Sequence, residues 1–384
     1  MSAESLVLPP PTDAPWPAEW DEVVVRLLAS GLSQLAERCA EGVPVRLPYP
    51  VSLQRALDRI SVMCLVRGVE APRSVVDLIR WCSRPVETWP LQLTADGFDP
   101  DTRLVVDGYP SREAQEWVVD SPDVEGEYRQ NTLIYEVMDI CRSNDRPDVY
   151  TAFRRLLVQR PALTEQEMAT ELGRPELVLV ANQVRQAYRT PPPEALIGNT
   201  VLVCRGCGNL LLPRGRDRVC VESDCSETRE TAIEHRANVG MLWIGRELRT
   251  FTAAPGRAEL RIWQHLCDSG LEVELWPDID AADLGIRFAG GKVWYADIKT
   301  YSNPATLARR LISRPFIPPY GSAAAYLVIG REQIAARRSY LNELYNRIPS
   351  LKGPARRGEQ VVAVSENEFV SAVLAHAREV NGDA

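Results

Sequence analysis

Two carboxylates and one ammonium group are predicted to share one face of a β-hairpin in the last third of the chain. Strand residues alternate between faces, and one face here is apolar: Leu284, Ile286, Phe288, Trp294, Ala296 and Ile298. The opposite face includes Asp283, Asp297 and Lys299. Two acids in a half-buried strand pair require a cation between them. A divalent metal is the natural candidate, because Mg2+ binds one or two carboxylates together with waters and phosphate oxygens.

The length of the hairpin turn decides whether the two acids meet, since a slip of one residue moves a whole strand's side chains to the other face. A two-residue turn at Gly290-Gly291 would place Asp283 opposite Ile298. A three-residue turn, Ala289–Gly291 with a left-handed glycine, places Asp283 opposite Asp297 and pairs apolar residues with apolar residues. We predict the second register.

A third acid, Glu259, lies upstream on a helix predicted from about Pro255 to Ser269. It falls on the core-facing stripe with Ile262, Trp263 and Leu266. A carboxylate on such a stripe needs a partner. Simpler interpretations stay open: Glu259 as a solvated helix residue, Lys299 as a protective edge-strand charge, and Asp283 as a turn cap like the nearby Asp278 and Asp280.

Four of the nine cysteines form a motif with the spacing of a zinc ribbon, C-x2-C, twelve residues, C-x4-C: Cys204, Cys207, Cys220 and Cys225. Four thiolates leave no open position, so the Zn2+ is predicted to be structural. Five other cysteines are scattered through apolar helical patterns and are expected to pack as small hydrophobic residues: Cys39, Cys64, Cys82, Cys141 and Cys267.

Arginines surround both candidate sites and could contact phosphates. Four decorate the zinc ribbon: Arg205, Arg214, Arg216 and Arg218. Arg309 and Arg310 lie on a helix predicted from Pro304 to Leu311. Zinc ribbons commonly present such arginines to nucleic acid, although a solvated charged hairpin is an equal alternative for the first group.

The chain is predicted to be an α+β multidomain protein with a helical N-terminal half. We expect four parts: a mostly helical domain (1–145), a helix-turn-helix or winged-helix-like unit (146–195), the zinc ribbon (199–230) and an α/β core with a mixed sheet (240–384). In the second unit, Thr164 and Glu167 form a capping box and Pro175 begins a third helix. That helix offers these groups for groove contacts: Asn182, Gln183, Arg185, Gln186 and Arg189.

The C-terminal order of elements resembles the restriction-endonuclease fold of the PD-(D/E)xK phosphodiesterases. The resemblance covers roughly Phe251 to Ala375: a helix with Glu259, a strand at 271–276, a strand with Asp283, a strand ending Asp297-x-Lys299, then a helix and a further strand. It implies that Asp283 and Asp297 hold Mg2+, that Lys299 orients or activates the attacking water, and that Glu259 completes the site.

The whole architecture also resembles the nuclease encoded beside prokaryotic PIWI-like proteins in bacterial defence islands (pPIWI_RE). This likeness implies a Mg2+-dependent endonuclease that cleaves double-stranded DNA, with a PIWI-like or helicase partner protein; a homodimer stays open. The alternative is a non-catalytic nucleic-acid-binding or assembly subunit that uses an inactive nuclease fold.

Length and composition agree with a globular protein of several domains. The chain has 384 residues, 45% of them hydrophobic, and a formal net charge of -8, which argues against a general nucleic-acid coating protein. It lacks a stretch of about 18 apolar residues and an N-terminal signal pattern. We therefore expect a cytoplasmic protein without a membrane segment.

Overall fold

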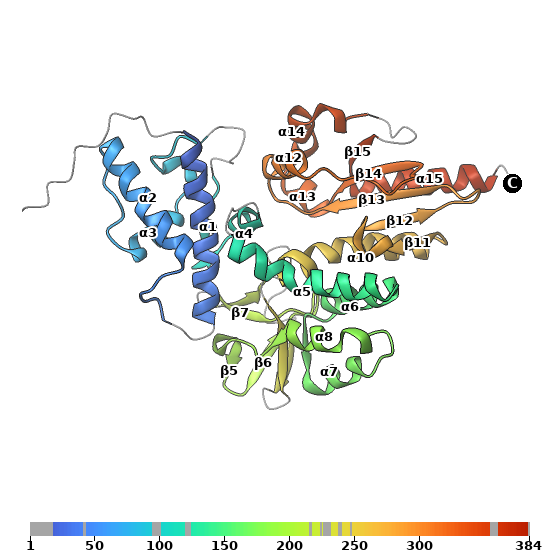
Figure 1. Cartoon of the computed structure of the whole chain (residues 1–384), viewed down its shortest axis with the longest axis horizontal. Coiled ribbons are helices and arrows are strands. Elements are labelled where there is room, and N and C mark those ends of the chain that lie inside the picture. The colour runs from blue at the N-terminus through green and yellow to red at the C-terminus, as the bar shows by residue number, and fades with distance from the viewer. Residues whose placement is uncertain are drawn as a thin grey trace, which may run out of the picture. The chain divides into compact units, whose positions relative to one another are not determined.

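The computed structural model describes residues 18–40, 44–93, 101–119, 124–214, 217–222, 225, 232–236, 240–245, 248–353 and 360–382. These residues fall into two compact units (Figure 1). One unit comprises residues 1–36 and 45–123, and the other residues 37–44 and 124–384.

The first unit is mainly helical, as predicted. Its elements are α1 (Ala18–Ala40), α2 (Val51–Arg67), α3 (Val75–Cys82), η1 (Val86–Thr88), β1 (Val105–Val106), β2 (Tyr109–Pro110) and α4 (Arg112–Val119). The side chain of Ser74 caps α3 by accepting a hydrogen bond from the backbone N–H of Asp77 (3.1 Å). The apolar stripes of α1, α2 and α3 meet in one core that includes Leu28, Leu53 and Leu78.

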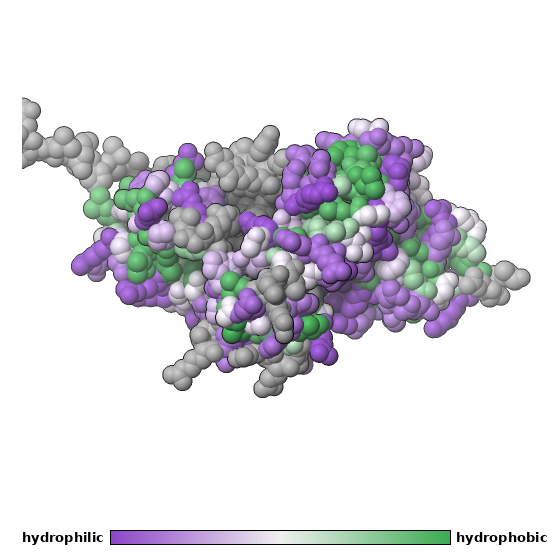
Figure 2. Space-filling view, turned by 90° about the horizontal axis from the view of Figure 1, so that it is seen from below, coloured by the Kyte–Doolittle hydropathy of each residue, from purple (hydrophilic) through white to green (hydrophobic). Residues whose placement is uncertain are grey.

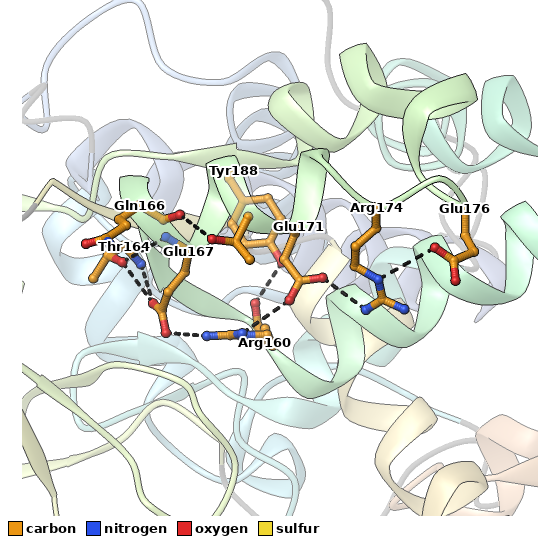
Figure 3. Close-up of polar contacts among 9 residues, drawn as sticks. Arg160, Thr164, Gln166, Glu167, Glu171, Arg174, Glu176 and Tyr188 are labelled. Carbon is orange, nitrogen blue, oxygen red and sulfur yellow. Dashed lines mark hydrogen bonds and ion pairs between the residues drawn. The ribbon is translucent and has the colours of Figure 1, made fainter.

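The second unit opens with helices α5 (Val124–Ser143), α6 (Pro147–Gln159), α7 (Glu165–Leu172), η2 (Val178–Val180) and α8 (Ala181–Ala187). The predicted capping box at Thr164 and Glu167 is present. Glu167 and Glu171 converge on Arg160, which ties the end of α6 to α7 (Figure 3). The helix expected to begin at Pro175 begins later, with a 3-10 turn at Val178.

A three-stranded antiparallel sheet completes this helical part. It contains β3 (Ala162–Thr164), β4 (Tyr188–Arg189) and β10 (Met241–Ile244), with β10 in the centre. The sequence assigns residues 241–244 to the nuclease core, whereas the structure pairs them with strands on the far side of the zinc ribbon. The reason is that the partners of β10 are more than 50 residues away in sequence (Trp243 pairs with Arg189), and no local pattern reports such pairing.

The segment between β4 and β10 contains the ribbon. Its elements are η3 (Pro193–Ala195), β5 (Leu196–Ile197), β6 (Thr200–Val203), β7 (Leu211–Arg214), β8 (Asp217–Cys220) and β9 (Ile233–Arg236). They form one sheet of order β5-β6-β9 and a separate β7-β8 hairpin.

The C-terminal part contains the predicted mixed sheet. Its strands, in spatial order, are β11 (Glu272–Leu275), β12 (Leu284–Arg287), β13 (Val293–Lys299), β14 (Ala324–Ile329) and β15 (Val361–Ser365). The first three strands are antiparallel and the last three are parallel. Leu284 pairs with Ala296, and the N–H of Phe288 donates to the carbonyl of Lys292, so the turn is Ala289–Gly291. The predicted register is confirmed.

Helices cover both faces of this sheet (Figure 1). They are η6 (Arg249–Ala253), α10 (Ala254–Asp268), α11 (Pro277–Asp280), α12 (Pro304–Ser313), α13 (Arg331–Ala336), α14 (Tyr340–Arg347), η7 (Pro349–Leu351) and α15 (Glu366–Gly382). Helices α10 and α15 pack with one apolar face, and α12 and α14 with the other. Helices α13 and α14 are separate, because the backbone is extended at Arg337.

No helix among the described residues is long and apolar enough to span a membrane. The surface seen in Figure 2 has separate hydrophobic patches among hydrophilic residues, which is ordinary for a folded protein surface.

Candidate active site and zinc centre

The β12–β13 hairpin brings together the two acids and the lysine predicted from the sequence. The register places Asp283, directly before β12, across from Asp297. The Oδ2 of Asp283 accepts a hydrogen bond from the N–H of Ile298 (2.6 Å), and the Nζ of Lys299 donates to Oδ1 of Asp297 (2.7 Å). The side chains of Asp283, Asp297 and Lys299 are 11%, 14% and 24% exposed. Each of the three side chains is therefore mostly buried but keeps some exposed surface.

The simpler interpretations of these residues do not agree with the geometry. Strand β13 lies between β12 and β14, so Lys299 is not an edge-strand charge. Asp283 bonds across the hairpin to Ile298 rather than within a local turn. Glu259 on α10 is 1% exposed, which excludes a solvated helix residue.

Glu259 has the partners that its burial requires. Its Oε2 accepts from the indole Nε1 of Trp276 (2.5 Å), and both its oxygens accept from Nη2 of Arg154 (3.0 and 2.9 Å). Arg154 comes from α6, over 100 residues earlier in the chain. The sequence analysis missed this residue. The available signal was a charged residue within the buried stripe of α6, one helical turn after Tyr150.

A fourth acid, Asp280, also reaches the arginine. It forms an ion pair with Nη1 of Arg154, while Nη2 lies 3.7 Å from Oδ1 of Asp283. The guanidinium also stacks over the ring of Trp276, 4.6 Å from its centroid. Arg154 therefore lies among three carboxylates, of which Asp280 was expected to be only a turn residue.

The turn that presents Asp280 has an unusual backbone. Trp276, Asp278, Ile279 and Asp280 have φ angles of 49, 50, 57 and 77°. Left-handed conformations are costly for residues other than glycine, most of all for a β-branched one. Ile279 is buried, and its packing with the main core holds the turn in place. Such strain is concentrated at functional sites in proteins.

The pKa values of the site residues are shifted, because several acids lie close together where they are largely shielded from water. Burial, together with the charges of Glu259 and Asp297, raises the pKa of Asp283 well above its usual range. The positive charges of Lys299 and Arg154 act in the opposite direction but do not outweigh this rise. Burial likewise raises the pKa of Glu259, although the charge of Arg154 acts to lower it. Burial alone would lower the pKa of Lys299, but Asp297 and Asp283 outweigh it and raise that pKa. Lys299 is therefore a cation at neutral pH.

The facing carboxylates of Asp283 and Asp297 suit one Mg2+ ion that keeps waters or phosphate oxygens as its other ligands. Among the described residues, the only group of three or more His, Cys, Asp or Glu ligand atoms within 4.8 Å of one another is the cysteine cluster. The carboxylate oxygens of Glu259 are bonded to Arg154 and therefore do not form such a group with those of Asp283 and Asp297.

The four motif cysteines converge at the ribbon. Their sulfur atoms all lie within 4.8 Å of one another, with Cys204 and Cys225 3.4 Å apart and Cys207 and Cys220 3.3 Å apart. Asn209 Nδ2 and the N–H of Glu222 point at the sulfurs of Cys207 and Cys220. Convergent thiols with N–H donors fit a tetrahedral Zn2+ held by thiolates.

The ribbon is joined to α10 by a buried ion network. Glu222, directly after the β8 strand and its cysteine, is 3.2 Å from Nε of Arg249 and 3.4 Å from Nη2 of Arg257. Arg249 lies on η6 and Arg257 on α10, two residues before Glu259. The second cysteine pair therefore helps to position the start of α10.

The predicted phosphate-contacting arginines have different surroundings. Arg205 is exposed in the first cysteine knuckle, and Arg309 and Arg310 are half-buried on α12. Arg218 donates to the carbonyls of Glu194, Ala195 and Leu196, so it fastens the ribbon to the preceding turn. Arg216 and the side chain of Arg214 lie outside the described residues.

Two families match separate parts of the chain. Residues 24–164 match the family described as pPIWI_RE three-gene island domain Y, and residues 256–381 match the family described as REase associating with pPIWI_RE. Both matching families are described by the pPIWI_RE island, and the second is described as a restriction endonuclease (REase) that associates with it. No curated protein and no solved structure matches it.

The two pPIWI_RE matches divide the site between them. Glu259, Asp283, Asp297 and Lys299 all fall within the REase match, whereas Arg154 falls within the domain Y match. The zinc ribbon lies in the interval between the two matches.

Replacing Asp283 by Asn should stabilise the metal-free protein at alkaline pH. The raised pKa of Asp283 means that the folded state favours its protonated form. The stability contributed by that proton is complete below the unfolded pKa of about 3.9 and is lost as pH rises through the folded pKa. Asn imitates the protonated acid. In EDTA, Asp283→Asn should therefore melt above the wild type at pH 8 and close to it at about pH 4.

The matched control for this comparison is Asp278→Asn, which changes an exposed acid of the neighbouring turn. Its melting temperature should follow the wild type at both pH values. A lower melting temperature for Asp283→Asn at pH 8 would contradict the electrostatic interpretation.

Replacing Cys207 by Ser should remove the zinc. The wild type should contain about one zinc per chain, and the variant little. Because zinc binding energy at such sites is also folding energy, limited proteolysis should cut the variant within residues 199–236. Metal analysis and mass spectrometry of fragments measure both effects. Cys267→Ser is the control, and equal zinc content in wild type and Cys207→Ser would refute the assignment.

Proposed function

We propose that this protein is a Mg2+-dependent endonuclease that cleaves phosphodiester bonds of DNA in a PIWI-associated bacterial defence system. The observation that carries the proposal is the facing pair Asp283 and Asp297 with Lys299 on the same face, at the end of a mixed sheet. The REase description of the matching family supports the same reaction class.

The residues have distinct parts in this proposal. Asp283 and Asp297 would hold Mg2+, which polarises the scissile phosphate and lowers the pKa of an attacking water when it is bound. The N–H of Ile298 orients the carboxylate of Asp283. Lys299 carries a proton at neutral pH, so it cannot act as a general base in that state. Its Nζ instead holds the attacking oxygen and stabilises the negative charge that develops on phosphate.

Nucleic acid would be bound by the helical part before the ribbon. The order α6, β3, α7, α8, β4, β10 and a sheet with β10 in the centre support the proposal of a winged-helix-like unit. Asn182, Arg185, Gln186 and Arg189 are exposed on α8 and β4. They would contact double-stranded DNA as the last helix of such units does. The ribbon, with Arg205 exposed, takes the place of the wing between β4 and β10.

The pPIWI_RE association points to a PIWI-like or helicase protein as partner, and a homodimer is a further option for double-strand cleavage.

The alternative function is a non-catalytic nucleic-acid-binding or assembly subunit. One observation favours it: Arg154 and Lys299 already neutralise the acids of the site from within.

Replacing Lys299 by Ala should lower plasmid cleavage in Mg2+ by at least ~100-fold, because a positioned proton donor or cation contributes that much to such reactions. Mg2+ binding, measured by calorimetry, should survive. Asp297→Ala should lose both Mg2+ binding and cleavage. Lys292→Ala, at the exposed end of the same hairpin, is the control. A Lys299→Ala protein that cuts at the wild-type rate would show that the lysine is structural.

Replacing Arg185 by Ala should weaken binding to duplex DNA roughly 5-fold and reduce the slope of log affinity against log salt by about one. Fluorescence anisotropy at several salt concentrations measures both. Arg174→Ala is the control, since its guanidinium is paired with Glu171 and Glu176. Unchanged affinity and slope for Arg185→Ala would remove α8 from the DNA-binding surface.

A further inference from the structure

The guanidinium of Arg154 lies where the acids of the nuclease core need a cation. It bonds both oxygens of Glu259, pairs with Asp280 and lies 3.7 Å from Asp283. The Arg154 side chain is 9% exposed, so it is enclosed by protein rather than resting on the surface. A permanent charge at this place contributes the positive field that would otherwise come from metal alone.

Packing of α6 against the nuclease core keeps Arg154 in position. A Cβ atom on Gly256 of α10 would lie 2.4 Å from Cγ2 of Val158, so the two helices approach as closely as a glycine allows. The hydroxyl of Thr151 is 3.5 Å from the carbonyl oxygen of Leu275. Arg154 extends between these two contacts. The helix that carries it cannot withdraw without opening the shared core.

The bonding of Arg154 differs from that of an ordinary core ion pair. An isolated ion pair needs one acid, whereas the guanidinium of Arg154 pairs with three acids. Its Nε still has no hydrogen-bond partner among the described residues. Asp283, 11% exposed, and Asp280, 27% exposed, add two further carboxylates beside the buried pair, and the desolvation of such charges is costly. The arrangement instead suits a site whose charge balance changes when a cation enters.

We propose that Arg154 is a positioning residue that serves as the built-in counter-cation of the nuclease acids. It fixes Glu259 and draws Asp283 into place before metal binds, and its charge opposes the binding of a divalent metal between Asp283 and Asp297. The inference rests on the proposed metal-dependent function. In this role, Glu259 anchors Arg154 rather than binding metal directly.

The consequence is that metal affinity depends on a residue outside the REase match. Arg154 belongs to the segment that matches domain Y, and the acids belong to the REase match. The strength of metal binding is therefore set by the contact of α6 with α10.

The test compares Arg154→Gln, Arg154→Lys and Arg155→Gln in the full-length protein. Arg155 is the matched control, since it stacks over Trp263 at 4.7 Å. Melting temperature is measured in EDTA, and Mg2+ and Mn2+ affinities are measured by calorimetry without DNA. Arg154→Gln should melt below the wild type in EDTA and bind both metals at least 10-fold more tightly. Arg154→Lys, which keeps the charge, and Arg155→Gln should bind metal as the wild type does.

A merely structural Arg154 would lower the melting temperature and leave metal affinity unchanged or weaker, and this result would overturn the inference. If Arg154→Gln does not fold, Arg154→Met with Glu259→Gln removes both charges of the buried pair together, and it is compared with Glu259→Gln alone. The same 10-fold gain is expected, and its absence counts against the inference.

Failure of the proposed function has a different signature. If the wild type and all variants bind neither Mg2+ nor Mn2+, both the nuclease proposal and the inference fall. If the wild type binds Mg2+ and cleaves DNA but Arg154→Gln binds metal no more tightly, the function stands and only the inference is refuted.

Discussion

The buried contact between Arg154 and Glu259 is the interaction on which the arrangement of the site depends. Each charge would be very costly to bury alone, and removing one member of such a pair typically costs about 3–5 kcal/mol. Trp276 shares in it, as a donor to Glu259 and as the aromatic surface under the guanidinium. Because α6, α10 and the turn before β12 all supply a member, the pair fixes three segments of the chain at one end of the sheet.

A second buried network repeats this principle at the start of α10, two residues before Glu259. Glu222 of the ribbon forms ion pairs with two arginines, one from η6 and one from α10. The guanidinium of Arg249 also lies 4.8 Å from the ring of Trp243 in β10. The ribbon is thus joined both to the β3-β10-β4 sheet and to the helix that carries Glu259. The folded ribbon therefore supports the geometry of acids that it does not touch.

Local patterns were sufficient for much of the fold. Period-two alternation and two glycines located the β12–β13 hairpin and its register, the cysteine spacing located the zinc site, and Thr164 with Glu167 marked the start of α7. Contacts between distant segments were not accessible in this way. Arg154 and Asp280 belong to the site only because α6 packs on α10, and β10 belongs to its sheet only through partners before the ribbon. A single sequence records that Glu259 needs a partner but not which residue it is.

The central place of β10 has a consequence for the order in which the chain can fold during synthesis. Strands β3 and β4 do not pair with each other; each pairs only with β10, which is made after the whole ribbon. A nascent chain that ends before residue 241 therefore holds two unpaired strand edges. The ribbon has left the ribosome and can take up its metal before that sheet closes, and α10 follows only afterwards. The ribbon is therefore complete in the chain before the strand that closes the sheet, and the hairpin with Asp283 and Asp297 is made after both.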